Sequence, residues 1–190
     1  MKTRESGMPE EVMWREFFDA EAILRLLKLT PSCRDVVEFG CGYGTFTIPA
    51  ARIVRGTVHA LDIEPDMIAV TQSKAEAEDL RNVQVCLRDF VCEGTGLPVA
   101  SVDYAMLFNI LHAESPGRML RESHRILVPG GFLGIIHWNH DPTTPRGPSM
   151  EIRPRPGQCC DWAVKAGFRL LNPGVIELPP YHYGMVLERP

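Results

Sequence analysis

The sequence predicts an α/β fold in which the strands of a mostly parallel sheet alternate with helices, and three observations support this. A short apolar run, Val36 to Phe39, leads into three glycines at alternate positions and then into a helical apolar pattern that ends near Ile53. A second run of β-formers, residues 57–62, ends in an acid just before a helix that begins with a proline. Further apolar strand segments, each followed by a turn or helical pattern, recur at 83–87, 102–108 and 132–138.

The glycines between the first strand and its helix form the central motif of the chain, Gly40-Cys41-Gly42-Tyr43-Gly44. A glycine has no Cβ, so the backbone of such a turn can approach a ligand closely and direct its N–H groups at it. Taken alone, the pattern leaves two alternatives open. It is either a ligand-binding turn or a closely packed turn of an α/β fold.

Asp62 favours the ligand-binding alternative, with a nucleoside as the ligand. It ends the second predicted strand, beside the glycine turn, where a carboxylate can accept both hydroxyl hydrogens of a ribose. The dinucleotide fingerprint is GxGxxG or GxGxxA, whereas this motif closes as GxGxG with Thr45 next, and an acid, Glu38, lies within the preceding strand. A nicotinamide-dependent oxidoreductase therefore remains an alternative that fits the motif less well.

At these residues the sequence resembles the class I S-adenosylmethionine-dependent methyltransferases of the small-molecule type. Five segments match that family in order and spacing, namely 38–44, 61–63, 88–90, 103–112 and 127–133. The resemblance implies a Rossmann-like, doubly wound, mostly parallel seven-stranded sheet with helices on both faces, in a single domain over residues 1–190. It also implies that one antiparallel strand closes the sheet, within a final strand pair at 168–171 and 183–187.

The same resemblance implies which residues bind S-adenosylmethionine. Asp62 is expected to accept the ribose hydroxyls, and Asp89 to accept a hydrogen bond from the adenine amino group, with Phe90 beside the ring. For Asp89, a helix or loop cap stays open as the alternative. The full set of expected cofactor-binding residues is Glu38, Gly40, Gly42, Gly44, Asp62, Ile63, Asp89, Phe90 and Asn109.

His112 is the candidate catalytic residue. Methyl transfer from a sulfonium is an in-line displacement, so the protein mainly aligns the reactants and excludes water, and a base is needed only for a protonated acceptor. His112 follows the fourth strand at the edge where open α/β sheets bind ligands; Glu114, Tyr43 and His137 are weaker candidates. A structural role for His112 stays open. No metal site is expected, because His137 and His140 would point to opposite faces of a strand.

Two segments are expected to border the site. Residues 1–30 predict a helical segment with two short helices between 9 and 28, the second capped by Asp19. Its aromatic side chains, Trp14, Phe17 and Phe18, are expected either to pack in the core or to form a lid over the cofactor pocket that also packs. Residues 139–157 contain five prolines and predict an irregular loop that walls the acceptor side of the pocket.

Composition narrows the class of protein further. A hydrophobic share of 45% and a charged share of 23% are ordinary for a globular protein. The net charge of -4 argues against a nucleic-acid partner, although Arg146, Arg153 and Arg155 are a local exception. No apolar run is long enough to span a bilayer, and the start lacks a signal-peptide pattern, so no membrane partner is expected.

The six cysteines show no CxxC spacing, and most are expected to be reduced packing residues of a cytoplasmic protein, including Cys33, Cys41, Cys86 and Cys92. The adjacent Cys159 and Cys160 are not expected to form a reactive thiol or arsenic site, because no third cysteine is placed beside them. The sequence thus predicts S-adenosylmethionine-dependent methyl transfer to a small-molecule acceptor. A nicotinamide-dependent oxidoreductase and a non-catalytic cofactor-binding protein remain the alternatives.

Overall fold

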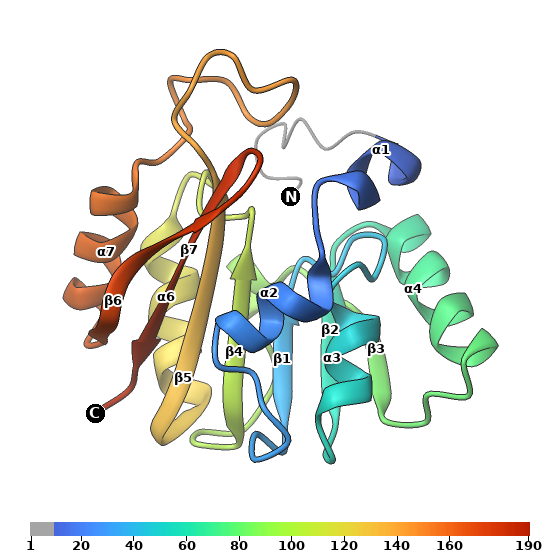
Figure 1. Cartoon of the computed structure of the whole chain (residues 1–190). Helices are drawn as coiled ribbons and strands as arrows, with labels where there is room; N and C mark the ends of the chain where they lie inside the picture. Colours follow the sequence, from blue (N-terminus) through green and yellow to red (C-terminus); the bar gives the residue numbers. More distant parts are fainter. Residues whose placement is uncertain (1–9) are drawn as a thin grey trace.

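Seven strands form one sheet in the order β3-β2-β1-β4-β5-β7-β6, in a computed structural model that describes residues 10–190 (Figure 1). Strand β7 runs antiparallel to both of its neighbours, and every other pairing is parallel. The predicted seven-stranded sheet with one antiparallel strand is therefore confirmed. The strands are β1 (Val36–Phe39), β2 (Val58–Asp62), β3 (Val83–Leu87), β4 (Val102–Phe108), β5 (Leu127–Trp138), β6 (Arg169–Leu178) and β7 (His182–Glu188).

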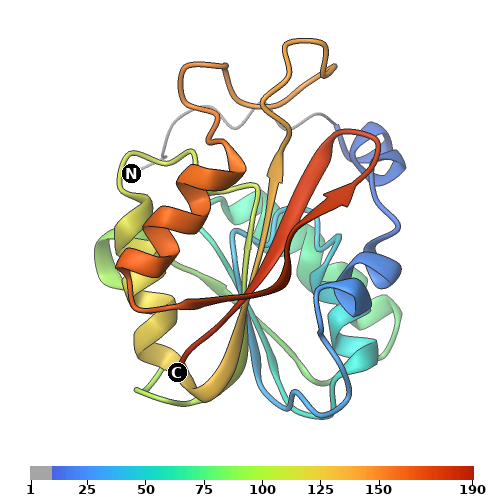
Figure 2. The same ribbon diagram turned by 60° about the vertical axis from the view of Figure 1, so that its left-hand side comes forward.

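Helices cover both faces of this sheet, as Figure 2 shows. Helices α6 and α7 pack on one face, and α2 and α3 pack on the other. The alternation of side chains along β4 supplies both layers, since Ala105 and Leu107 point to one and Tyr104 and Met106 to the other. The helices are α1 (Glu11–Glu16), α2 (Ala20–Leu26), α3 (Thr47–Ile53), α4 (Pro65–Ala77), α5 (Phe90–Glu93), α6 (Pro116–Ile126) and α7 (Pro156–Lys165).

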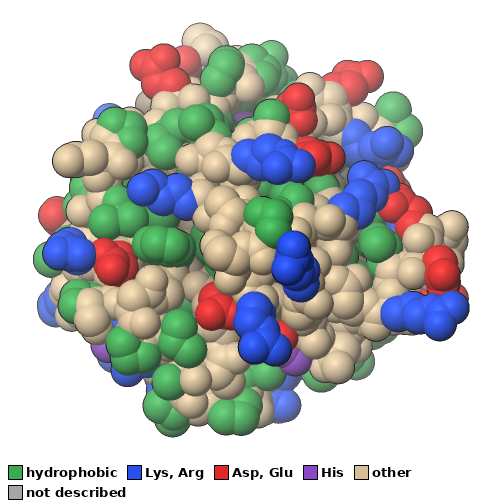
Figure 3. All heavy atoms as spheres, turned by 60° about the horizontal axis from the view of Figure 1, so that its bottom comes forward, with side chains coloured by type: hydrophobic (Ala, Val, Ile, Leu, Met, Phe, Trp, Pro, Cys, Tyr) green, Lys and Arg blue, Asp and Glu red, His purple; other side chains and the backbone are tan. Residues whose placement is uncertain are grey.

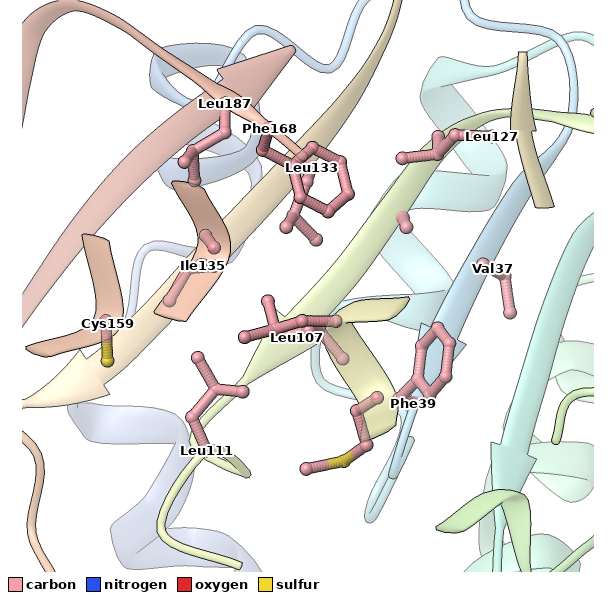
Figure 4. Close-up of a cluster of buried hydrophobic side chains, with 14 of the residues drawn as sticks. Val37, Phe39, Leu107, Leu111, Leu127, Leu133, Ile135, Cys159, Phe168 and Leu187 are labelled. Atoms are coloured by element: carbon pink, nitrogen blue, oxygen red, sulfur yellow. The ribbon is translucent and has the colours of Figure 1, made fainter. Parts of the chain in front are cut away.

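The core beneath α6 and α7 is apolar and tightly buried. Figure 4 shows Phe39 of β1, Leu107 of β4 and Ile135 of β5 pointing into it, with Cys159 of α7 at its edge. On the other face the hydroxyl of Tyr104 donates to the carbonyl of Leu27 at 2.8 Å, which joins the end of α2 to the sheet. The closely packed central strands therefore hold the residues that follow their carboxyl ends in fixed positions.

Several boundaries differ from the sequence prediction. Strand β5 begins at Leu127, before the predicted start at residue 132, and so includes the Pro-Gly-Gly run at 129–131. Its pairing with β4 shifts register between Val102 and Tyr104. Strand β6 continues to Leu178, well beyond the predicted end, again with a register shift. Helix α5 was not predicted. Ser115 occupies the position before α6 but its side chain makes no capping hydrogen bond, whereas Asp19 caps α2 as predicted, accepting from the Ala22 N–H at 3.1 Å.

The six cysteines are free thiols, but they do not all pack. Cys33, Cys41 and Cys159 are buried, as expected. The expectation was wrong for Cys86 and Cys92, which are exposed because β3 is the outermost strand and α5 lies at the surface.

The lengths of the helices and the charges on one face of the molecule bear on its partners. Within residues 10–190, no helix combines the length and the apolar character that a membrane span needs. Figure 3 looks onto the edge of the sheet opposite the carboxyl ends of its parallel strands, and there basic, acidic and hydrophobic side chains are interspersed.

Candidate active site

A cavity opens at the carboxyl ends of β1, β2 and β4, where the strand order reverses between β1 and β4. Open α/β sheets bind their ligands at this switch point. Eight of the ten predicted site residues line the cavity, namely Glu38, Gly40, Gly42, Asp62, Ile63, Phe90, Asn109 and His112. Gly44 and Asp89 do not.

The glycine turn combines the two roles that the sequence left open. Gly40, Gly42 and Gly44 all have left-handed φ values, 76°, 52° and 73°. A Cβ on Gly40 would lie 2.9 Å from Ile110 Cδ1, so this position keeps the backbone beside the cavity wall. A Cβ on Gly44 would instead meet Thr71 of α4 at 3.1 Å. Gly44 is therefore a packing glycine, and Gly40 and Gly42 border the cavity.

Asp62 organises the backbone around the cavity. One carboxylate oxygen accepts from the Gly42 N–H at 2.9 Å, and the other accepts from the Glu64 N–H at 3.0 Å. The residue is only 7% exposed. Each carboxylate oxygen can accept more than one hydrogen bond. The geometry therefore allows Asp62 to fix both turns and still accept from a ribose.

Glu38 adds a second buried carboxyl group to the same wall. It lies in β1, all four residues of which are buried, and it accepts a hydrogen bond from the Thr47 hydroxyl at the start of α3. Burial raises the pKa of Glu38 from 4.5 to about 8, more than the Thr47 hydrogen bond lowers it, and the nearby Asp62 raises it further. A positively charged ligand would favour the ionised form of Glu38. S-adenosylmethionine has this charge.

Asn109 carries hydrogen-bonding groups that the described residues do not use. It follows β4 with φ 54°, a conformation that residues other than glycine rarely adopt, and its N–H donates to the Ile136 carbonyl at 2.7 Å. Its side-chain oxygen and nitrogen are both buried, with no hydrogen-bond partner among residues 10–190. Buried amides without partners are unfavourable and rare in native proteins. The donor set therefore fits a ligand that hydrogen-bonds here.

The two residues after β3 that are expected at the adenine ring, Asp89 and Phe90, have different surroundings. Asp89 caps α5, with its carboxylate accepting from the Cys92 N–H at 3.0 Å, so the cap that the sequence left open is present. Phe90 lines the cavity and packs edge-to-face on Phe39, with ring centroids 5.4 Å apart. A contact of Asp89 with adenine stays a prediction.

His112 lies between this cavity and a second, more polar one under the loop at 139–155. It is 5% exposed, and its Nδ1 is 3.4 Å from Nε2 of His137. Of the weaker base candidates, Glu114 lines the second cavity, whereas Tyr43 and His137 line neither. The other polar residues of the second cavity include His140, Glu151, Arg155 and Gln158.

Aromatic side chains of the N-terminal segment close the first cavity on one side. Trp14 lines the cavity. The ring centroid of Trp138 lies 6.0 Å from that of Trp14 and 5.6 Å from that of Phe17. The predicted aromatic packing is confirmed, but α1 ends at Glu16, so Phe17 and Phe18 follow the helix instead of sharing its face. Figure 1 shows α1 at the carboxyl-end edge of the sheet. Residues 1–9 of the predicted helical segment lie outside the described residues.

A lysine of α4 holds this segment to the glycine turn. Lys74 Nζ donates to Glu11 of α1 and to the Tyr43 carbonyl, both at 2.6 Å. The same ammonium group thus joins α1 to the backbone beside the cavity. The predicted lid function remains a prediction, but this contact is its physical basis.

The irregular loop is present as predicted, over 139–155, because α7 begins at Pro156. Arg153, one of the three arginines that are a local exception to the acidic net charge, does not add its charge to the surface. Arg153 is buried, and its guanidinium donates to the carbonyls of Asn139 (3.1 Å), Asp141 (3.2 Å) and Pro148 (2.7 Å). The loop is therefore organised around one arginine, which no local sequence pattern identifies.

His140 lies beyond the end of β5 at Trp138. The alternation of side chains along a strand, which was expected to direct His137 and His140 to opposite faces, therefore does not apply to His140. In the part of the chain that the structure describes, no three His, Cys, Asp or Glu side chains are arranged to hold a metal ion.

Comparison with known proteins identifies the family. The model of a methyltransferase domain matches residues 36–131, from β1 into β5. The chain therefore belongs to this methyltransferase family, as the resemblance predicted.

Named relatives agree with that assignment. The chain is 38% identical over 103 residues to aklanonic acid methyltransferase DauC of Streptomyces sp. (strain C5), a match covering 53% of this chain and 46% of that protein. It is 29% identical over 128 residues to demethylmenaquinone methyltransferase of Listeria welshimeri, covering 66% of this chain and 51% of that protein. The chain thus spans about half the length of the curated relatives it matches.

A solved structure has the same fold over nearly its whole length. A SAM dependent methyltransferase from Aquifex aeolicus superposes with a TM-score of 0.82 at 24% identity, covering 97% of this chain and 95% of that one. The predicted fold class of S-adenosylmethionine-dependent methyltransferases is confirmed.

Proposed function

We propose that this protein binds S-adenosylmethionine in the first cavity and transfers its methyl group to a small molecule held in the second. The observation that carries the proposal is Asn109, whose buried amide lacks a partner among the described residues, beside the glycine turn and Asp62. Membership of a methyltransferase family supports the same conclusion. We also propose that residues 1–190 form a single domain.

Each end of the cofactor has suitable groups in the cavity. Asp62 would accept the ribose hydroxyls. Glu38 would pair with the ammonium group of the charged amino-acid end. Phe90 and Ile63 offer apolar contact for the adenine ring. Asp89 is outside the lining of the cavity but adjoins Phe90, and it would accept from the adenine amino group.

The cofactor supplies a methyl carbon that its sulfonium makes electrophilic. The chain supplies alignment and a dry site, closed by Trp14 and Trp138. A lone pair of the acceptor forms the new bond to the methyl carbon while the carbon–sulfur bond breaks, and the sulfur keeps that electron pair. Where the acceptor arrives protonated, His112 takes the proton and later releases it to solvent.

The acceptor is a small molecule with several hydrogen-bonding groups. The second cavity brings His140, Glu151, Arg155 and Gln158 around His112, which suits a polar ligand better than a hydrocarbon. The relatives named above act on aklanonic acid and demethylmenaquinone by their names, which supports a small acceptor. The net charge of -4 supports the absence of a nucleic-acid substrate. The free cysteines support a cytoplasmic location.

The test is an assay of S-adenosylhomocysteine release from S-adenosylmethionine across a panel of small molecules. With an accepted substrate, His112→Gln should lower turnover about 10²-fold or more and remove the acidic limb of the pH–rate curve, with cofactor affinity nearly unchanged. His59→Gln is the matched control, since His59 lies on β2 and lines neither cavity. A variant of His112 with full activity and the same limb would return that residue to a structural role.

The alternatives give different results in the same experiment. Tight binding of S-adenosylmethionine without turnover across the panel would favour a non-catalytic cofactor-binding protein. Binding of a nicotinamide cofactor in its place would favour an oxidoreductase and contradict the proposal.

A further inference from the structure

A buried histidine lies behind His112 where the strand pattern calls for an apolar side chain. Leu133 and Ile135 of β5 point into the core beneath α6 and α7, and alternation directs His137 to the same face. His137 is fully buried and stacks on Tyr183 of β7, with ring centroids 6.4 Å apart and an interplanar angle of 30°. A polar ring in such a position is costly unless a partner compensates for its burial.

The partner is His112. Nδ1 of His112 lies 3.4 Å from Nε2 of His137, and the two rings meet edge to face at 75° with centroids 5.5 Å apart. The parallel pairing of β4 with β5 sets this contact, because Phe108, the last residue of β4, pairs with Ile136. His137 is still in β5, paired with Tyr183 of β7, and lies beside the segment that leaves β4 toward His112. The two histidines are 25 positions apart with α6 between them, so no local sequence signal links them.

The charge state of His137 determines whether it can accept a hydrogen bond from His112. Burial lowers the pKa of His137 well below 6.5, and the neighbouring His112, His182 and Arg153 act in the same direction. A neutral imidazole carries one N–H and one lone pair. When His112 has taken a proton, both of its nitrogens are donors, and a neutral His137 can accept from Nδ1 through its Nε2.

We propose that His137 is the positioning residue of His112: it accepts a hydrogen bond from Nδ1 of His112 and so leaves the lone pair of the neutral ring on Nε2. The catalytic part of this inference rests on the proposed function, in which His112 takes the proton of the acceptor. The opposite arrangement, with His137 donating to Nδ1, would put the proton of neutral His112 on Nε2 and prevent that step.

Tyr183, on which His137 stacks, is itself held by two contacts. The Tyr183 hydroxyl donates to the Pro154 carbonyl at 3.0 Å and lies 3.3 Å from Cys159 of α7, which fixes the ring on which His137 stacks. Burial raises the pKa of both Tyr183 and Cys159, so both are neutral. The charged and titratable groups near the pair include Arg153 of the loop, His182 and Tyr183 of β7, and Cys159 of α7. With His112, the first cavity is also lined by Glu38, Asp62 and Glu64, and the second by Glu114, His140, Glu151 and Arg155.

The tautomer of His112 can be measured without any acceptor. The full chain, labelled with ¹⁵N in its imidazole rings and saturated with S-adenosylhomocysteine, would be studied by NMR at pH 7.5, with assignment by single His→Gln variants. We expect Nδ1 of His112 to be the protonated nitrogen and Nε2 to carry the lone pair. A protonated Nε2 with an unprotonated Nδ1 would overturn the inference.

Variants of His137 separate positioning from packing. His137→Gln retains an oxygen that can accept near the Nε2 position, so it should preserve the Nδ1–H tautomer and the pH–rate curve. His137→Leu retains volume and removes the acceptor, so it should lose that tautomer and lower kcat about tenfold or more, with KM for S-adenosylmethionine unchanged. Leu187→Ala is the stability control, because it opens a cavity in β7 at the opposite end of the sheet.

The outcomes for this inference and for the proposed function are distinguishable. If His112→Gln is inactive but His137→Leu matches the Leu187→Ala control in both tautomer and kcat, the positioning role is wrong and the methyl-transfer proposal stands. If the tautomer depends on His137 as expected but no acceptor is methylated, the hydrogen bond is supported and the proposed function fails. If His137→Leu does not fold, the tautomers of the wild type and of His137→Gln still decide.

Discussion

Replacing Glu38 by glutamine should stabilise the protein at neutral pH while weakening its affinity for S-adenosylmethionine. Glutamine keeps the size of the side chain and an oxygen that accepts from the Thr47 hydroxyl. It removes only the ability to ionise in a buried site. Because the folded state raises the pKa of Glu38, it holds this proton more tightly than the unfolded chain does.

The magnitude follows from the difference in pKa, 4.5 in the unfolded chain against about 8 in the folded protein. Stability from the protonated group is fully present below pH 4.5 and is lost as the pH rises through about 8. Linkage makes this loss about 3 kcal/mol between pH 4 and pH 7, and about 5 kcal/mol above pH 9. The Glu38→Gln variant does not titrate here, so its stability relative to the wild type should rise by these amounts.

The assay is urea unfolding of both proteins, without ligand, at several pH values from 4 to 9. The difference between the two free energies of unfolding isolates Glu38 from other titrating groups, such as Glu122, whose pKa the Arg125 hydrogen bond lowers to about 2. Calorimetry with S-adenosylmethionine in buffers of different ionisation enthalpy should show proton release by the wild type alone. A difference in stability that stays constant with pH would refute the raised pKa.

Three further predictions concern neighbouring residues. Asn109→Gly should stabilise the ligand-free protein by up to about 1 kcal/mol, because glycine adopts the positive φ without strain. The same variant should bind the cofactor more weakly. A calorimetric affinity equal to that of the wild type would argue against a contact between Asn109 and the cofactor. Asp62→Asn should weaken S-adenosylmethionine binding by roughly 1.5–3 kcal/mol, and an unchanged dissociation constant in the folded variant would exclude Asp62 as the ribose acceptor. Glu11→Gln removes an ion pair with Lys74 in which both side chains are about one-third exposed, so deuterium exchange of α1 should rise roughly twofold while the unfolding midpoint stays constant. Exchange identical to the wild type would mean that this contact does not hold α1.

The parts of the fold predicted from sequence are those with local signals. The apolar run of β1, the glycines after it and the acid that ends β2 lie within 27 residues, and their order alone predicts a turn beside a carboxylate. Helix α4 follows from Pro65 in its first turn. These features need no knowledge of distant contacts, and the structure has them where the sequence placed them.

The features that the sequence did not reveal depend on distant contacts. Residues 129–131 have the composition of a turn, but pairing with β4 and β7 keeps them within β5. Arg153 has the appearance of a surface charge, yet it binds backbone carbonyls up to 14 positions away. The pKa of Glu38 depends on complete burial of β1, which strand propensity does not quantify. The candidate cavity could be located from the sequence, but its electrostatics could not.

The central claim is that the cavity at the carboxyl ends of β1, β2 and β4 is a binding site for S-adenosylmethionine. Isothermal titration calorimetry of the full chain with S-adenosylmethionine, and separately with NAD, tests it most directly. We predict binding of one S-adenosylmethionine per chain, competed by S-adenosylhomocysteine and weakened in Asp62→Asn, with no heat from NAD. No binding of S-adenosylmethionine by the folded wild type, or saturable binding of NAD that Asp62→Asn weakens, would contradict the claim.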